Sequence, residues 1–184
     1  MGLLPISSGE MQFQGNNLNR QIAEARASLG IGYVPQGREI FPRLTVEENL
    51  RVAVYARKDK SADILDKIYG IFPVLKQMRK RRGGDLSGGQ QQQLAIARAL
   101  ASEPSVLLLD EPTEGIQPSI IKEMAKTLKK IRDKRGLTIM VSEQVLSLAL
   151  DVADRILVIE KGKIVLDVPV AEADQETISK YLSV

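Results

Sequence analysis

The chain has 184 residues, 43% of them hydrophobic, which is enough for one domain with a buried core and argues against disorder. It has no cysteine and no histidine, which excludes disulfide frameworks, thiolate or imidazole metal sites and nucleophiles activated by histidine. The formal net charge of +3 permits an anionic partner without requiring one, and no apolar run approaches the roughly 18 residues of a membrane span.

The N-terminal segment begins as though a helix were ending. Met1 to Pro5 combine an apolar stretch with a glycine and a proline, which are helix stop signals. A turn at residues 7–9 leads into a short predicted strand over residues 10–14. Residues 31–34 are rich in β-forming side chains and predict a second strand, which ends at Pro35.

Residues 45–85 are predicted to form a helical lobe. Thr45 and Glu48 have the spacing of a capping box, which marks the start of a helix. Apolar periodicity favours helix over residues 61–82, and Pro73 is expected to kink or break it. The basic run at residues 79–82 has no interspersed aromatic residues, so we interpret it as a solvated helical face rather than a nucleic-acid site.

The second half alternates strands and helices. The apolar run at residues 106–109 predicts a strand buried on both faces. The other predicted elements are a helix from Pro118 to Gly136, a strand over 137–141, a helix over 145–153, a hairpin over 155–167 and a helix over 171–182. This alternation predicts a single α/β domain over residues 1–184 with a parallel sheet and a C-terminal hairpin and helix at 155–184.

The stretch at residues 86–90 points to phosphate chemistry. Ser87 occupies a predicted cap position, and Gly88 and Gly89 open the following helix. The amides at such a helix start attract anions, and glycines let a ligand approach closely. Alone, the two glycines are explained equally well by an ordinary glycine-rich helix start.

Two acids at the end of a buried strand favour the first interpretation. Asp110 and Glu111 follow the apolar run at residues 106–109, and open α/β sheets bind ligands at the carboxyl ends of their strands. An aspartate there can hold Mg²⁺, and a neighbouring glutamate can polarise an attacking water. Solvated acids at a strand end are the alternative, which the preceding serine–glycine turn makes less favourable.

In this order the motifs resemble the ATP-binding cassette (ABC) ATPases. Residues 86–90 resemble the signature motif, residues 106–111 the Walker B strand, and residues 33–36 the Q-loop, and the resemblance spans the whole chain. It implies a P-loop NTPase-like ABC core with a helical signature lobe. It also implies that two subunits sandwich two ATP molecules with Mg²⁺.

The resemblance also implies roles for individual residues. Ser87, Gly88, Gly89 and Gln90 would contact, in trans, the γ-phosphate held by the other subunit; Asp110 and Gln36 would support Mg²⁺; Glu111 would be the general base; Gln144 would stand at the switch position; and Gly115 and Gln117 would lie in the D-loop. The switch residue is usually histidine, whereas glutamine donates a hydrogen bond but carries no proton. A solvated polar residue at a helix start is the alternative interpretation of Gln144. The D-loop usually has aspartate where Gln117 stands.

A narrower resemblance concerns residues 37–42 and 114–119, which are similar to ATPase subunits of importers for branched-chain amino acids and urea, with residues 37–42 and 180–184 leaning toward urea. It implies transmembrane permease partners, a homo- or heterodimer with another ABC ATPase subunit, and a cytoplasmic location on the inner face of the membrane. No nucleic-acid partner is expected.

The phosphate-binding loop of the family is not found in this sequence. No G-x-x-x-x-G-K-[ST] segment occurs, and Gly162-Lys163 lies in the predicted hairpin turn. We therefore expect an N-terminally truncated, incomplete core that lacks its first strands and exposes apolar surface. One alternative is a non-hydrolytic fragment that only docks on transporter partners. Another is an ABC protein of DNA repair or translation, although those usually carry large insertions or tandem cassettes.

Overall fold

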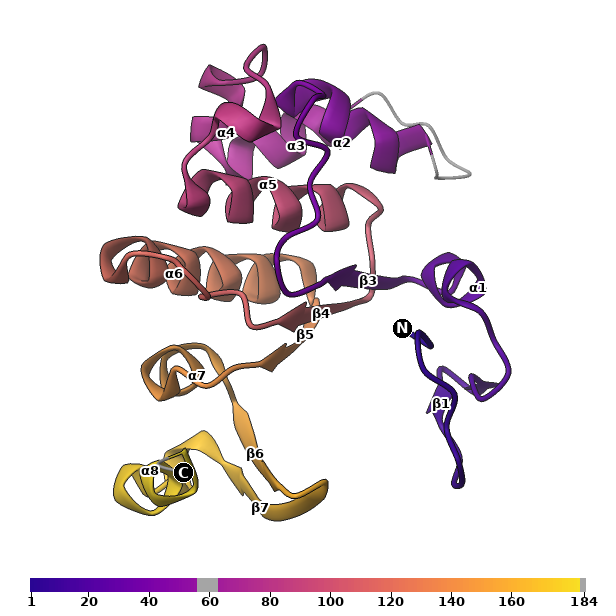
Figure 1. Ribbon diagram of the computed structural model, residues 1–184, viewed down its shortest axis with the longest axis vertical. Coiled ribbons are helices and arrows are strands. Elements are labelled where there is room, and N and C mark those ends of the chain that lie inside the picture. Colours follow the sequence, from indigo (N-terminus) through magenta and orange to yellow (C-terminus); the bar gives the residue numbers. More distant parts are fainter. Residues whose placement is uncertain (56–62, 183–184) are drawn as a thin grey trace.

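A parallel three-stranded sheet lies at the centre of the computed structural model, which describes residues 1–55 and 63–182 (Figure 1). Its strands, in spatial order, are β3 (Ile31–Val34), β4 (Val106–Asp110) and β5 (Thr138–Ser142). Both strand pairs are parallel, as required when each strand is followed by a helical crossover. The α/β class expected from the alternation of strands and helices is confirmed.

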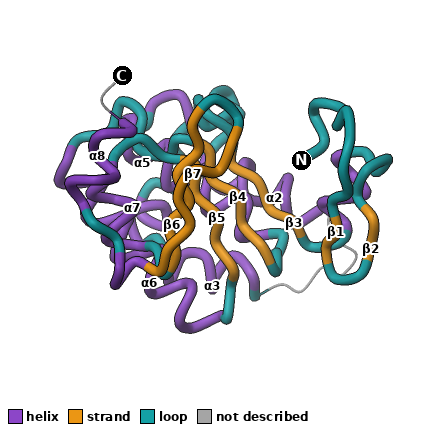
Figure 2. The backbone as a smooth tube through the Cα atoms, turned by 90° about the horizontal axis from the view of Figure 1, so that it is seen from below, coloured by secondary structure: helices purple, strands orange, loops and turns teal. Residues whose placement is uncertain are grey.

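The segment before β3 differs from the prediction. The expected strand over residues 10–14 is shortened to β1 (Gln12–Phe13), which pairs with β2 (Asn16–Asn17), and a helix that was not predicted, α1 (Ala23–Ser28), follows. Met1 to Pro5 contain no helical turn. Figure 2 shows this hairpin at the opposite end of the molecule from helix α8 (Gln175–Leu182).

A buried arginine holds the N-terminal segment together. Arg26 donates hydrogen bonds to the carbonyl oxygens of Gln21 at 3.0 Å and Leu18 at 2.7 Å. These charge-assisted bonds give the Gln21 carbonyl oxygen a donor and add a second donor to the Leu18 carbonyl oxygen, which also accepts the Gln21 amide. The loop over residues 18–21 is therefore held by the side chain of Arg26, which follows it in the sequence.

The helical lobe forms largely as predicted. It contains α2 (Val46–Tyr55), α3 (Ile64–Ile71), α4 (Pro73–Gln77) and the 3₁₀ turn η1 (Gly83–Asp85). The capping box is present, because the Glu48 amide donates to Thr45 Oγ1 at 3.2 Å and the Thr45 amide donates to Glu48 Oε2 at 2.7 Å. The break at Pro73 is confirmed, whereas the predicted helix start at residue 61 lies outside the described residues.

The basic run has a backbone role in the lobe. The carbonyl oxygens of Arg79 and Arg81 accept hydrogen bonds from the amides of Glu47 at 3.0 Å and Val46 at 2.9 Å. These amides lie in the first turn of α2, where donors lack partners within the helix. The four basic side chains, at residues 79–82, are exposed, as expected, but they do not form a helical face, because α4 ends at Gln77 and residues 78–82 are turns and an extended segment.

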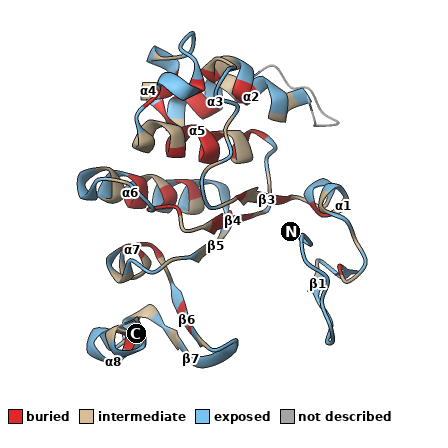
Figure 3. Cartoon of the chain, viewed as in Figure 1, coloured by how far each residue is buried: buried red, intermediate tan, exposed pale blue. Residues whose placement is uncertain are grey.

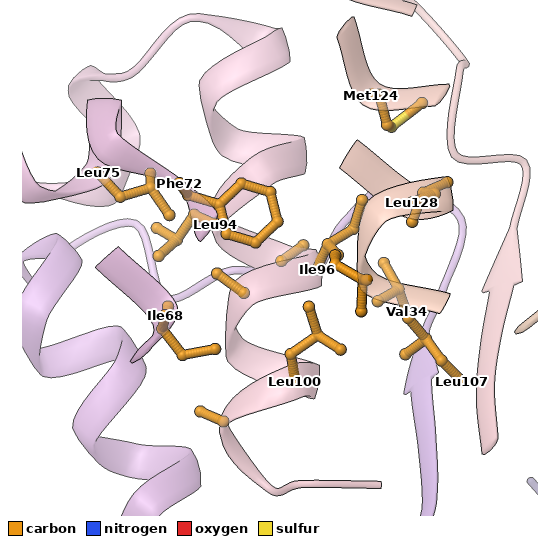
Figure 4. Close-up of a cluster of buried hydrophobic side chains, with 14 of the residues drawn as sticks. Val34, Ile68, Phe72, Leu75, Leu94, Ile96, Leu100, Leu107, Met124 and Leu128 are labelled. Atoms are coloured by element: carbon orange, nitrogen blue, oxygen red, sulfur yellow. The ribbon is translucent and has the colours of Figure 1, made fainter. Parts of the chain in front are cut away.

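One hydrophobic core joins the lobe to the sheet through helix α5 (Gly88–Ala101). Figure 4 shows Leu94, Ile96 and Leu100 of α5 between the lobe side chains and the sheet. The other labelled members are Ile68, Phe72 and Leu75 from the lobe, Val34 and Leu107 from the strands, and Met124 and Leu128 from α6 (Pro118–Arg135). In Figure 3 the buried positions concentrate on α5 and its neighbours, whereas β7 (Lys163–Pro169) and α8 are mostly exposed.

The expectation that β4 is buried on both faces is wrong. Leu107 and Leu109 are buried in the core, whereas Val106 and Leu108 are only partly covered. Helices α5 and α6 pack on the face that carries the buried pair, and the described residues cover the other face incompletely. Met140 on the neighbouring strand β5 is 58% exposed, so apolar surface is indeed left open to solvent.

The C-terminal part forms the predicted hairpin and helices. Helix α7 (Leu146–Val152) precedes β6 (Arg155–Glu160), which pairs antiparallel with β7. The last helix begins at Gln175 rather than at residue 171, because Asp174 accepts the Thr177 amide at 3.0 Å and so caps α8. Among the described residues, no helix has both the length and the hydropathy needed to cross a bilayer.

Asn49 tests how helix α2 of the lobe is joined to the segment that precedes it, residues 41–45. It is fully buried; its Oδ1 accepts the Phe41 amide at 2.8 Å, and its Nδ2 contacts three carbonyl oxygens, those of Phe41, Leu44 and Thr45. Asn49→Leu keeps the size but leaves the Phe41 amide without its acceptor, and it removes one of the two donors of each carbonyl oxygen, because a backbone amide also donates to all three. We therefore expect the free energy of unfolding to fall by about 1–3 kcal/mol in urea titrations. Val52→Ala, at an exposed position of α2, is the control and should change it by less than about 0.5 kcal/mol. Equal losses in the two variants would contradict this role.

Candidate functional site

The carboxylate of Glu111 lies where the three loops after β3, β4 and β5 meet. Gln36 Nε2 donates to its Oε2 at 3.1 Å, and Gln144 Nε2 donates to its Oε1 at 2.8 Å. The Glu111 amide donates to the Ser142 carbonyl oxygen at 2.9 Å, which continues the β4–β5 ladder by one residue. The structure thus brings together the three residues expected to supply the general base, a metal ligand and the switch.

The backbone of Glu111 is unusual as well. Its φ is +42°, in the left-handed region that a residue with a side chain rarely adopts. Such conformations cost of order 1–3 kcal/mol and are often found at functional sites. The turn redirects the chain out of β4 and places the Glu111 carboxylate between the two glutamine amides.

Asp110 lies beside Tyr33, which belongs to the segment that resembles the Q-loop but for which the sequence predicted no role. The Tyr33 hydroxyl donates to Asp110 Oδ2 at 3.4 Å. Burial raises the pKa of Tyr33, and the negative charge of Asp110 raises it further. Tyr33 therefore remains a neutral donor that orients the carboxylate at neutral pH.

The predicted Mg²⁺ ligands, Asp110 and Gln36, offer a carboxylate and an amide oxygen, which are donors that a hard cation accepts. Gln36 uses its nitrogen to bind Glu111, so its side-chain oxygen remains for a cation. Within residues 1–55 and 63–182 no three or more histidine, cysteine, aspartate or glutamate side chains are grouped so that they could hold a metal ion. The two residues fit a Mg²⁺ ion that takes its remaining oxygens from water and phosphate.

A second carboxylate, Glu143, fixes the loop that carries Gln144. Its Oε1 accepts the amides of Gln144 at 2.9 Å and Val145 at 3.0 Å, and its Oε2 accepts the hydroxyl of buried Thr113 at 2.7 Å. The side chain therefore joins the loop after β5 to the loop after β4. Nothing in the sequence marked Glu143 beyond its place next to Gln144.

The glycine turn forms the N-terminus of α5. Ser87 is the cap, and a reciprocal capping box joins it to Gln90: the Gln90 amide donates to Ser87 Oγ at 3.4 Å, and the Ser87 amide donates to Gln90 Oε1 at 3.0 Å. The Ser-x-x-Gln spacing is a signal for this box that the sequence interpretation did not use. Gly89 also has a packing reason, because a Cβ there would lie 2.8 Å from Ile120 Cγ2.

The predicted D-loop residues lie just before α6. Gly115 has a φ of +66°, which favours glycine. Gln117 is the N-cap residue of α6, and its carbonyl oxygen accepts the amides of Ile120 and Ile121.

Comparisons with known proteins identify the family and the relatives of the chain. A family model described as ABC transporter matches residues 1–114. The chain is 41% identical over 161 residues to the high-affinity branched-chain amino acid transport ATP-binding protein BraG of Pseudomonas aeruginosa, which covers 87% of this chain and 69% of BraG. It is 37% identical to the probable branched-chain amino acid transport ATP-binding protein LivF of Archaeoglobus fulgidus, covering 89% of this chain and 70% of that protein.

Other relatives have different transport roles. The lipopolysaccharide export system ATP-binding protein LptB of Haemophilus influenzae is 35% identical, over 90% of this chain and 69% of LptB. Among solved structures, the dimeric bacterial ABC transporter cassette MJ0796 superposes with a TM-score of 0.79 and 25% identity, covering 91% of this chain and 76% of that one. cbiO1 of Clostridium perfringens, part of the transporter complex cbiONQ, superposes with a TM-score of 0.78 and 26% identity, over 97% and 74% of the two chains.

The role of Glu143 can be tested through stability. Glu143→Ala removes the acceptor of a buried hydroxyl and of two amides, so we expect the free energy of unfolding to fall by about 1–3 kcal/mol in urea titrations. Asp151→Ala, at an exposed position of α7, is the matched control and should change it by less than about 0.5 kcal/mol. Thr113→Val should reproduce part of the loss. A Glu143→Ala variant as stable as its control would show that these hydrogen bonds do not hold the loop.

Proposed function

The chain belongs to the ABC transporter family of ATPases, and we propose that it is the ATP-hydrolysing subunit of an importer for branched-chain amino acids. The observation that carries the proposal is the Glu111 carboxylate, held by the amides of Gln36 and Gln144 at the carboxyl end of a parallel strand. The names of BraG and LivF support branched-chain amino acids rather than urea as the solute.

Glu111 acts as the general base. Neutral amide donors orient its carboxylate without neutralising its charge. As the water oxygen attacks the γ-phosphorus of ATP, a proton of that water passes to Glu111, and ADP leaves with its bridging oxygen. Neither glutamine can take this proton, so their contribution is to position the base.

Asp110 and Gln36 would hold Mg²⁺, which when bound neutralises charge on the phosphate oxygens. The Tyr33 hydroxyl positions the Asp110 carboxylate for this contact. The sequence contains no G-x-x-x-x-G-K-[ST] segment, and we assign the primary contacts of the β- and γ-phosphates to none of the residues described here.

The glycine turn serves a nucleotide held by the other subunit. Gly88 and Gly89 are the first two residues of α5, where amides have no acceptor within the helix. Ser87 and Gln90 hold this turn in shape through their capping box, and the helix dipole favours an anion there. Gly115 and Gln117 extend the same contact surface as the D-loop.

The proposal includes an assembly. Transmembrane permease subunits provide the solute path, and a homo- or heterodimer of ATPase subunits provides two nucleotide sites on the cytoplasmic face of the membrane. The dimeric MJ0796 structure supports the paired arrangement. We propose one ABC ATPase domain over residues 1–184, with the helical lobe at 45–85 and the C-terminal hairpin and helix at 155–184.

Phosphate release from Mg-ATP tests the catalytic proposal. Glu111→Gln keeps the size of the side chain but removes the base, so we expect kcat to fall at least about 100-fold with little change in nucleotide affinity. Glu123→Gln, on an exposed position of α6, should leave kcat unchanged. Absence of ATP binding by the wild-type chain at millimolar nucleotide would contradict the ATPase proposal and favour a docking role alone.

The solute has its own test. Cells that lack this gene should lose uptake of radiolabelled leucine and recover it when the wild-type gene is restored. Unchanged leucine uptake together with lost urea uptake or impaired lipopolysaccharide export would contradict the proposed solute and leave the ATPase assignment intact.

A further inference from the structure

A strained turn follows Gln36 directly. Gly37, Arg38 and Glu39 have φ values of +78°, +71° and +47°, three consecutive residues in the left-handed region. The Glu39 amide donates to the Gly37 carbonyl oxygen at 2.8 Å, which closes a three-residue γ-turn centred on Arg38. A γ-turn with positive φ at its centre is rare and strained, so its surroundings must hold it in place.

The turn directs the Arg38 side chain between two segments of the candidate sites. Its Nη1 donates to Gln91 Oε1 on α5 at 3.2 Å, and its Nη2 donates to the Glu114 carbonyl oxygen at 3.0 Å. The guanidinium also adjoins both glycine positions, because a Cβ on Gly88 would lie 3.4 Å from Nη1 and a Cβ on Gly115 would lie 3.6 Å from Nη2. One rigid, forked cation therefore contacts the first turn of α5 and the segment before α6.

Gln91 extends this link to the glycine turn. While its oxygen accepts from Arg38, its Nε2 donates to the carbonyl oxygen of Leu86 at 3.2 Å and that of Gly83 at 3.4 Å. Leu86 directly precedes Ser87. A continuous series of hydrogen bonds thus runs from Glu114 through Arg38 and Gln91 to the start of the glycine turn.

A second arginine supports the strained turn from α5. Arg98 Nη2 donates to the Glu39 carbonyl oxygen at 2.7 Å, and its guanidinium carbon lies 4.9 Å from the centre of the Phe41 ring. This cation–π contact and the charged hydrogen bond fix the residues that follow Arg38. The turn is therefore anchored to α5 at its strained centre, through Arg38, and at the next residue, through Glu39.

We propose that Arg38 is a positioning residue that holds residues 87–90 and residues 114–117 in one fixed arrangement. The catalytic consequence rests on the proposed function, under which both segments face the nucleotide of the other subunit. If they move together, Arg38 affects the transition state through the segments it holds and touches no reacting atom. Its loss should then lower kcat more than it changes KM.

Amide hydrogen exchange of the full chain tests the linkage without nucleotide. Arg38→Asn keeps a residue that tolerates positive φ but removes the fork, so exchange at residues 87–90 and 114–117 should rise about tenfold while β5 stays unchanged. Arg38→Lys should not restore protection, because one ammonium cannot reproduce the two-branched contact. Arg43→Asn, at an exposed arginine of the same connecting segment, is the matched control and should leave exchange unchanged.

Steady-state kinetics provide the second measurement. In an ATP-hydrolysing assembly, Arg38→Asn should lower kcat about tenfold with KM for ATP unchanged. Exchange changes confined to residues 37–39, or full rescue of both measurements by Arg38→Lys, would overturn the proposal. A wild-type assembly that hydrolyses no ATP would contradict the proposed function instead, and the exchange measurement would still decide whether Arg38 links the two segments.

Discussion

Helix α5 packs against the lobe on one side and the sheet on the other, and both candidate sites depend on this burial. Leu94, Ala95, Ile96 and Ala97 are four successive buried residues, so nearly the whole circumference of the helix is removed from water. Shifting or rotating α5 would open cavities in a close-packed core. Its first turn and the side chains of Gln91 and Arg98 therefore occupy fixed positions relative to β3 and β4.

Features that depend on neighbours along the chain were predictable. The Thr45–Glu48 box, the break at Pro73 and the hairpin turn at residues 161–162 all form where local chemistry indicated. Helix α1 was not predicted, because it is short, its N-cap residue makes no side-chain hydrogen bond, and Arg26 holds it through distant carbonyl oxygens. The packing reason for Gly89 was not predictable either, because the close approach of Ile120 arises only when α5 and α6 pack together.

The candidate site likewise contains residues that the sequence predicted and residues whose roles it did not. Gln36, Glu111 and Gln144 each follow one of three adjacent parallel strands, and the rule that ligands bind at the carboxyl edge of such sheets predicts their proximity. The sequence predicted no role for the side chains of Tyr33, Arg38 and Glu143, because those roles depend on where each side chain points and on partners from other loops. A single sequence shows which residues leave a strand but not which acceptors a guanidinium will reach.

The contact between Gln144 and Glu111 has a consequence for how the site responds to acidity. An imidazole at that position would gain or lose its charge near pH 6.5, so the environment of the base would change within the range that cells experience. A carboxamide does not titrate there and presents the same N–H at every physiological pH. The hydrogen bond that Gln144 donates to Glu111 therefore does not depend on a proton that the switch residue itself must gain or lose.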